Sequence, residues 1–307
     1  MQRNHHPLFG LALGTLAVIL FGASLPATRL AVFALDPWFV TTARGALAGL
    51  VAAAVLAGFR RAVPWPDLPR LALISLCLVV GFPGLMAVAM VTVPSAHGGV
   101  ILGLLPMATA IAAVFFAGER PSPFFWAMSV FGAALVVLFS MRDGAILPVA
   151  GDLILFVAVA ICGTGYALAG TLSRRMPGWE VISWAVVVSL PVLVPATILL
   201  WPDNMSTVPL PSLGGLLYLA LVSQYFGFWL WNTALAIGGV ARIGQVQLLQ
   251  TFATLVIAAL LLDETIDPRM VLFACAVVGV VAAGLRARVG SKERGGASLT
   301  PVGSGRS

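Results

Sequence analysis

Long apolar segments follow one another along most of this 307-residue chain, and the short stretches between them hold most of its charges. Each segment is about 20 residues long, which is the length that an α-helix needs to cross a hydrocarbon core of about 30 Å. Ten such helices are predicted, over residues 8–33, 38–58, 69–91, 95–117, 122–141, 150–173, 178–200, 211–236, 240–262 and 268–287. The predicted fold class is therefore all-α, a polytopic membrane protein with ten transmembrane helices.

The composition excludes several classes of protein. Charged residues make up 9% of the chain, whereas a soluble domain carries about a quarter, and the mean hydropathy is +1.05. A soluble globular enzyme, a disordered protein and a nucleic-acid-binding module are all excluded by these values. The net charge of +6 does not indicate a nucleic-acid partner, because the basic residues lie at predicted helix ends and in the C-terminal tail.

The distribution of arginine predicts the orientation in the membrane. If the N-terminus is cytoplasmic, thirteen basic residues fall on the inner side and three, Arg29, Arg142 and Arg269, on the outer side. Cytoplasmic loops carry an excess of Lys and Arg, so both termini are expected in the cytoplasm. Arg44 is left inside the second span.

The two halves of the chain resemble each other weakly, which predicts an internal repeat. Shifts of 141 and 145 positions pair Gly22 with Gly163, Ala108-Thr109 with Ala253-Thr254, Glu119 with Glu264, and Pro123 with Pro268. Five helices per half is an odd number, so the second half enters the membrane from the opposite side, as in many secondary transporters. We predict two inverted five-helix repeats, residues 1–145 and 146–287, followed by a disordered cytoplasmic tail, residues 288–307.

Several motifs resemble one known family. The stretch Ser95-Ala-His-Gly-Gly-Val-Ile-Leu-Gly-Leu-Leu-Pro106, continued by Gly118-Glu119-Arg120, resembles the fourth-span signature of the EamA family of the drug/metabolite transporter superfamily. Other positions similar to that family are Phe21-Gly22, Arg44-Gly45-Ala46 and Leu230-Trp231-Asn232. The resemblance implies ten spans in a bacterial inner membrane and export of small metabolites, often amino acids, from the cytoplasm. Bacterial aromatic amino-acid exporters are the relatives it suggests.

Two departures from the repeat distinguish the halves. Thr251 stands where Pro106 predicts a proline, and Ala185 stands where Arg44 predicts an arginine. The halves are therefore expected to contribute unequally to a substrate site.

Polar residues inside the spans are the candidate substrate-binding groups, because such residues normally face the bundle or a water-filled cavity. In the ninth span, Gln247, Gln250, Thr251 and Thr254 share one helical face, with Gln245 nearby. Glutamine presents donors and an acceptor, which suits a zwitterion. The alternative for this face is hydrogen bonding between helices.

The eighth span offers a face that combines amides with rings: Gln224, Phe228 and Asn232, with Tyr225 and Trp229 beside them. It suits an aromatic side chain, and ordinary packing is the alternative for the rings. Further candidates are Tyr166, Ser24 and His97, which could hold a carboxylate or a proton or be a satisfied interfacial residue. Arg44 is interpreted first as a snorkelling residue, with binding of a substrate carboxylate as the alternative.

All eleven acidic residues fall at predicted helix ends or in loops, so no buried acidic proton carrier is expected. Facilitated or weakly coupled transport is compatible with this pattern, and the choice between it and proton-coupled transport stays open. No catalytic or metal-binding motif stands out, so neither an enzyme nor a cofactor is predicted. The expected partners are a small-molecule substrate and the lipid bilayer, with the chain a monomer or weak homodimer. The function predicted is a secondary transporter that exports small metabolites, with aromatic or other neutral amino acids favoured, by alternating access around a central polar and aromatic cavity. Multidrug or nucleotide-sugar transport is the alternative.

Overall fold

The computed structural model describes residues 7–117, 122–140, 150–173, 175–238 and 246–296, and every regular element within these ranges is a helix. Seven of the helical segments described are long and apolar enough to cross a membrane: Leu8–Val32, Pro37–Gly58, Trp65–Ala89, Ser95–Phe116, Ala150–Leu172, Gly178–Leu199 and Leu210–Ala234. Three shorter apolar helices lie at Pro123–Phe139, Leu249–Leu262 and Pro268–Gly284. The chain is thus an all-helical polytopic membrane protein, and the count of ten spans stays a prediction.

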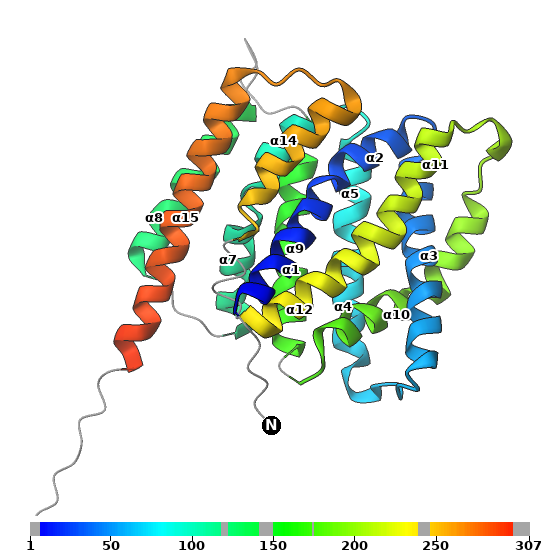
Figure 1. The fold of residues 1–307 in the computed structure, drawn as a ribbon, viewed down its shortest axis with the longest axis horizontal. Coiled ribbons are helices and arrows are strands. Elements are labelled where there is room, and N and C mark those ends of the chain that lie inside the picture. The colour runs from blue at the N-terminus through cyan, green and yellow to red at the C-terminus, as the bar shows by residue number, and fades with distance from the viewer. Residues whose placement is uncertain (1–6, 118–121, 141–149, 174, 239–245, 297–307) are drawn as a thin grey trace, which may run out of the picture.

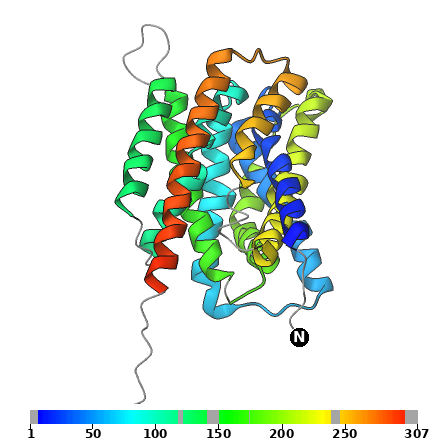
Figure 2. The ribbon, with the colours of Figure 1, turned by 60° about the vertical axis from the view of Figure 1, so that its left-hand side comes forward.

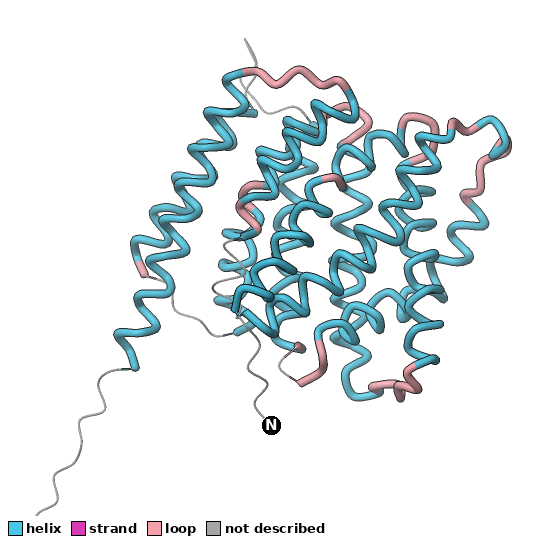
Figure 3. Tube along the Cα trace, in the orientation of Figure 1, coloured by secondary structure: helices cyan, strands magenta, loops and turns pink. Residues whose placement is uncertain are grey.

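The helices of the first half form a run in which several predicted spans are subdivided (Figures 1 and 3). They are α1 (Pro7–Gly22), α2 (Ser24–Val32), α3 (Pro37–Gly58), η1 (Trp65–Asp67), α4 (Leu68–Ser75), η2 (Leu76–Gly81), α5 (Phe82–Ala89), α6 (Ser95–Leu102), α7 (Leu105–Ala117) and α8 (Pro123–Ser140). Those of the second half are α9 (Ala150–Leu172), α10 (Gly178–Leu199), η3 (Met205–Thr207), α11 (Leu210–Leu217), η4 (Tyr218–Gly227), α12 (Phe228–Gly238), α14 (Leu249–Leu262) and α15 (Pro268–Gly296).

A proline explains the break between α1 and α2. Pro26 has no N–H group to donate to the carbonyl of Gly22, four residues earlier, so that carbonyl is free for another partner. The hydroxyl of Thr254, from α14, donates a hydrogen bond of 2.9 Å to it. The break in the first predicted span is thereby stabilised by the ninth.

A π-helical turn in the third predicted span has a similar consequence. In η2 the N–H of Phe82 donates to the carbonyl of Cys77, five residues back, rather than to that of Leu78. The released carbonyl of Leu78 accepts a hydrogen bond of 3.3 Å from the side-chain amide of Gln224, in η4. An irregular turn in one half therefore holds a polar side chain of the other half.

The two halves pack against each other in reciprocal pairs. Helix α1 packs against α12 and α14, while α9 packs against α5 and α7. A Cβ added at Gly22 in α1 would lie 2.7 Å from Cβ of Ala253, and one added at Gly163 in α9 would lie 2.7 Å from the carbonyl carbon of Ala108. Both close approaches depend on the missing side chain of a glycine.

Two further contacts between the halves complete this pattern. Helix α3 packs against α10, and α8 packs against α15 at one edge of the bundle, where Figures 1 and 2 show them side by side. Each of these pairs joins elements that the predicted repeat would make equivalent.

Large apolar side chains cover the outside of the bundle. Val192 is 68% exposed and Leu260 is 79% exposed. Exposed apolar surface on this scale is costly in water, and lipid acyl chains are its natural surroundings.

The described ends of the chain, at the start of α1 and the end of α15, lie at the same end of the bundle (Figures 1 and 2). Helix α15 continues to Gly296, past residue 288 where the tail was predicted to become disordered. The predicted boundary at residue 287 lies before the end of this helix, because Gly290, Gly295 and Gly296 disfavour a helix and gave no reason to extend it. Helix α14 begins at Leu249, and the first residues of the predicted span, 240–245, lie outside the described residues.

Candidate functional site

A small cavity of about 30 Å³ lies at the centre of the bundle, and both halves contribute to its lining. Its lining residues are Phe21, Ser24, Arg44, Leu78, Phe82, Pro83, Met86, Leu102, Leu105, Tyr166, Ser223, Gln224, Phe228 and Gln250. These residues come from α1, α2, α3, η2, α5, α6, α7, α9, η4, α12 and α14. Five of the predicted site residues, Ser24, Arg44, Tyr166, Gln224 and Gln250, therefore meet at one place.

Arg44 supplies the charge of this cavity. The residue is 3% exposed, and its Nη2 lies 3.5 Å from the hydroxyl of Ser223, which is hydrogen-bonded to Ser24 at 2.7 Å. Its Nε and Nη1 have no hydrogen-bond partner within the described part of the chain. The interpretation of Arg44 as a snorkelling residue is wrong, because its guanidinium points into the protein and leaves two donors unused.

Gln224 lies beside this group and is completely buried. Its Nε2 is held by the carbonyl of Leu78 at 3.3 Å, while its Oε1 is without a hydrogen-bond partner among the residues described. A buried carbonyl oxygen of this kind can accept a hydrogen bond from an ammonium group.

Aromatic rings form the apolar wall of the cavity. The rings of Phe21 and Phe228 meet edge to face with centroids 5.1 Å apart, and Tyr166 meets Phe228 at 5.8 Å. Such a wall buries an apolar or aromatic substrate side chain. Among the lining residues of this cavity, Arg44 is the only charged one, so the cavity favours an anionic group.

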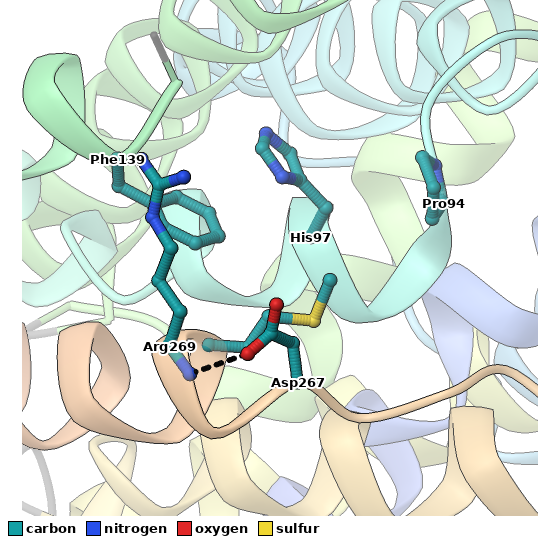
Figure 4. A pocket seen from close by; sticks show the side chains of 6 residues that line it. Pro94, His97, Phe139, Asp267 and Arg269 are labelled. Carbon is teal, nitrogen blue, oxygen red and sulfur yellow. Dashed lines mark hydrogen bonds between the residues drawn. The ribbon is translucent and has the colours of Figure 1, made fainter. Parts of the chain in front are cut away.

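A second cavity, of about 230 Å³, lies at the end of the bundle where α6 and α15 begin. Pro94, His97, Phe139, Asp267, Arg269 and Met270 line it (Figure 4). The ring of His97 stacks on that of Phe139, with centroids 4.5 Å apart and an angle of 25° between the planes. This cavity is larger than the central one and has exposed residues, Asp267 and Arg269, at its rim.

Behind His97 lies a carboxylate that the sequence did not single out. Nε2 of His97 is 3.1 Å from Oδ1 of Asp152, and the side chain of Asp152 has no exposed surface. The expectation that the chain has no buried acid is therefore wrong. Asp152 stands in the first turn of α9, and helix packing buries this turn although it lies near the helix end.

The other candidates of the eighth span make contacts within the bundle. The hydroxyl of Tyr225 lies 3.1 Å from that of Ser183. The ring of Trp229 stacks on Trp179 with centroids 5.5 Å apart, and the amide of Asn232 donates to the carbonyl of Gly178 at 2.9 Å.

The polar residues predicted to share one face of the ninth span lie in different environments in the structure. Gln250 lines the central cavity, and Thr254 bonds the carbonyl of Gly22. Thr251 is 2% exposed and packs near Gly103. Gln247 is 7% exposed, and its Nε2 is unbonded within the described residues. Gln245 lies outside the described residues.

Sequence reasoning missed Ser223, Phe21 and Phe82 as cavity residues. Ser223 precedes Gln224 and could have been found as a polar residue in the same span. Phe21 belongs to the family-like pair Phe21-Gly22, which could have indicated it, whereas Phe82 resembles any other core residue in an apolar run. Within the described residues, no group of three or more His, Cys, Asp or Glu side chains could hold a metal ion.

Comparison with known proteins places the chain in a family. The profile of the EamA-like transporter family matches residues 8–141 and again residues 149–284. The chain belongs to the EamA-like transporter family. The resemblance carried by Ser95–Pro106 is thus confirmed, and the two matches fall on the two halves of this EamA-family transporter.

Two curated relatives and one solved structure are similar to this EamA-family chain. It is 43% identical over 274 residues to "Uncharacterized transporter YdeK" of Bacillus subtilis (strain 168), covering 89% of this chain and 96% of the relative. It is 26% identical over 213 residues to a "Probable terminal-alkyne amino-acid exporter" of Streptantibioticus cattleyicolor, covering 66% and 68%. A crystal structure shares the fold, with a TM-score of 0.58 and 22% identity over 93% of this chain and 98% of that one.

Proposed function

We propose that this EamA-family protein is a secondary transporter that exports amino acids, aromatic or otherwise neutral, from the cytoplasm. The observation that carries the proposal is the buried guanidinium of Arg44, a residue that lines the central cavity and whose Nε and Nη1 are unbonded among the described residues. A buried cation with unused donors is costly unless an anion completes it. A substrate carboxylate is such an anion, and it suits the fork of donors that arginine presents.

The rest of the cavity fits the other parts of an amino acid. The free Oε1 of Gln224 can accept a hydrogen bond from the α-ammonium group, and Gln250 adds a second amide. The rings of Phe21, Tyr166 and Phe228 can enclose an apolar or aromatic side chain. One of the relatives is named as an amino-acid exporter, which agrees with this substrate class.

The size of the cavity supports a mechanism of alternating access. A volume of about 30 Å³ is too small for an amino acid, so the helices must separate before substrate enters. The reciprocal contacts of Gly22 with Ala253 and of Gly163 with Ala108 support two inverted repeats. Two similar halves of opposite orientation can open to either side in turn around one site.

The proposed setting is a bacterial inner membrane with ten spans and both termini in the cytoplasm. The excess of arginine on that side supports this orientation, and so does the position of both described chain ends at one end of the bundle. The relatives come from bacteria. A multidrug transporter of cations is disfavoured by the positive charge of Arg44.

The test measures exchange of L-phenylalanine in proteoliposomes that contain the purified protein, with phenethylamine, which lacks the carboxylate, and a nucleotide sugar as comparison substrates. Arg44→Met should reduce phenylalanine exchange about 10- to 100-fold, because a hydrogen bond to a charged group contributes about 1.5–3 kcal/mol. Arg44→Lys should restore part of it, since the charge remains and the fork is lost.

Arg70→Met is the matched control, because Arg70 is 56% exposed at the start of α4, far from the cavity lining. It should exchange phenylalanine at the wild-type rate. Wild-type exchange by Arg44→Met would contradict the assigned role of Arg44. Exchange of the nucleotide sugar but not of phenylalanine would contradict the substrate class.

A further inference from the structure

We propose that His97 and Asp152 form a proton-binding site that controls opening of the outer end of the transporter. The ligand is a proton taken from the external solution through the cavity beside His97. The proposal rests on the proposed function in one respect: the exporter's orientation identifies this end of the bundle as the outer end, from which substrate leaves.

The pair joins the two halves of the protein at one end of the bundle. His97 is in the first turn of α6 and Asp152 in the first turn of α9, and Nε2 lies 3.1 Å from Oδ1. The side chains are 7% and 0% exposed. Nε2 of His97 and both carboxylate oxygens of Asp152 form no aligned hydrogen bond within the described ranges, so the 3.1 Å approach of the two side chains is an ion-pair distance.

The neighbouring cavity gives protons a route to this pair. It has a volume of about 230 Å³ and is lined by His97 itself, by Phe139, and by the exposed residues Asp267 and Arg269 at its rim (Figure 4). A buried histidine next to a cavity of this kind can exchange a proton with the solution on that side. Histidine is the side chain that changes charge most readily near physiological pH.

Other charged groups near the pair have partners of their own. On the N-terminal side of α6, the carboxylate of Glu264 accepts hydrogen bonds from the backbone N–H groups of Ser95 and Ala96 and lies 3.5 Å from Nε of Arg29. From the start of α15, the carboxylate of Asp267 accepts a hydrogen bond from the backbone N–H of Arg269.

The guanidinium of Arg269 lies 5.8 Å from the ring centre of Phe273. The element that packs on the other face of the His97 ring, α8, contributes the uncharged ring of Phe139. Among the described groups around the pair, His97 is therefore the one that can take a proton while lying in direct contact with the carboxylate of Asp152.

Protonation changes how strongly the pair holds the halves together. With neutral His97, the buried pair has a net charge of −1, which is costly in a low-dielectric interior. With protonated His97, the net charge is zero and the contact becomes a charge-assisted hydrogen bond, roughly twice as strong as a neutral one.

A positive charge on His97 therefore stabilises the state in which the pair is formed. By linkage, a lower external pH shifts the protein towards the state with the outer end closed. Efflux should then slow when the external solution, and not the lumen, becomes acidic.

The experiment uses a reporter that does not depend on any substrate. Met86 lines the central cavity and is 1% exposed, so a cysteine at this position reacts with a membrane-impermeant thiol reagent only when the outer end opens. The reporter is Met86→Cys combined with Cys275→Ala, because Cys275 is the exposed native cysteine among those described. Labelling is measured in proteoliposomes at about pH 5.5 and about pH 7.5 outside, with the lumen held at about pH 7.5.

The labelling rate is divided by that of the same reporter carrying His97→Gln, which cancels the effect of pH on the thiol itself. We expect this ratio to be about tenfold lower at the lower external pH than at the higher one. A tenfold change in the population of the open state is what one charge-assisted hydrogen bond produces. Asp152→Asn should remove the pH dependence as His97→Gln does, and it provides a second reference if one variant folds poorly. Asp203→Asn, which removes an exposed carboxylate from the loop before α11, should keep the full pH dependence.

Efflux of L-phenylalanine under the same conditions separates this proposal from the proposed function. A ratio that is equal at the two values of pH overturns the proton site, whether or not phenylalanine is transported. A pH-dependent ratio supports the proton site even if phenylalanine is not carried, and that result would overturn only the proposed substrate class. An equal effect of acid in the lumen on the labelling ratio would overturn access from the outside.

Discussion

Substitution of Gly163 by alanine tests whether the two halves approach each other as closely as the structure shows. A Cβ at this position in α9 would lie 2.7 Å from the carbonyl carbon of Ala108 and 2.8 Å from the backbone N of Thr109, both in α7. Two carbon atoms in contact normally lie about 3.5–4.0 Å apart. Backbone atoms of a helix cannot rotate aside, so α7 and α9 would have to separate by about 1 Å.

The loss of stability caused by Gly163→Ala follows from this geometry. Overpacking a closely packed interface destabilises a protein by about 1–3 kcal/mol, and contact with backbone rather than with a flexible side chain places Gly163→Ala near the upper limit. The midpoint of thermal unfolding should fall by roughly 4–10 °C, at about 2–4 °C per kcal/mol. The measurement is tryptophan fluorescence of the detergent-purified protein, heated at one fixed rate because such unfolding is often irreversible.

A control in the same helix isolates the contact from the substitution. At Gly170 an added Cβ would have no atom within 4 Å, so Gly170→Ala should leave the midpoint unchanged or raise it, as helix propensity predicts. At Gly22 the nearest atom, at 2.7 Å, is a side-chain methyl, and the nearest backbone atoms are 3.3 Å away. Gly22→Ala should therefore fall between the other two. An unfolding midpoint for Gly163→Ala equal to that of Gly170→Ala would refute the reasoning.

Two other predictions concern a carboxylate at a helix end and two amides of the ninth predicted span, of which Gln250 lines the central cavity. Glu264→Gln should lower the stability by about 1 kcal/mol, since it removes the charge that faces the N-terminus of α6 and Arg29 but keeps the shape; thermal unfolding measures this, and an unchanged midpoint would show that the charge contributes nothing. Gln247→Leu combined with Gln250→Leu should abolish phenylalanine efflux from proteoliposomes while the protein stays folded, because the amides are the polar groups offered by this part of the ninth span. Normal efflux by the double variant would exclude both amides from the site.

The division of the chain into apolar helices could be predicted well from the sequence, and their irregularities only in part. The starts of α3 at Pro37 and of α10 at Gly178 follow from local punctuation. The break at Ala23 depends on Pro26, which is visible in the sequence, but also on Thr254, which donates to the carbonyl of Gly22 from more than 200 residues away. No local pattern contains that partner.

In the candidate site, too, some features could be predicted from the local sequence and others depend on distant residues. Gln224, Gln250, Ser24 and Tyr166 were recognised as polar residues inside apolar helices, and the structure brings them to one cavity. Helical spacing could not show that Arg44 points into that cavity rather than towards the membrane surface. The guanidinium of Arg44 lies next to Ser223, which is in η4 and therefore distant in the sequence.

The amino-acid sequence by itself determined that this chain lies in a membrane, how its helices follow one another and to which family it belongs. These properties depend on the transfer of local segments from water to lipid, and each segment carries its own free energy of transfer. Only the tertiary structure decided which polar groups are buried without partners, as at Arg44, and which form a pair across the halves, as His97 and Asp152 do. Burial and pairing depend on what the neighbouring helices contribute, and those neighbours are distant in the sequence.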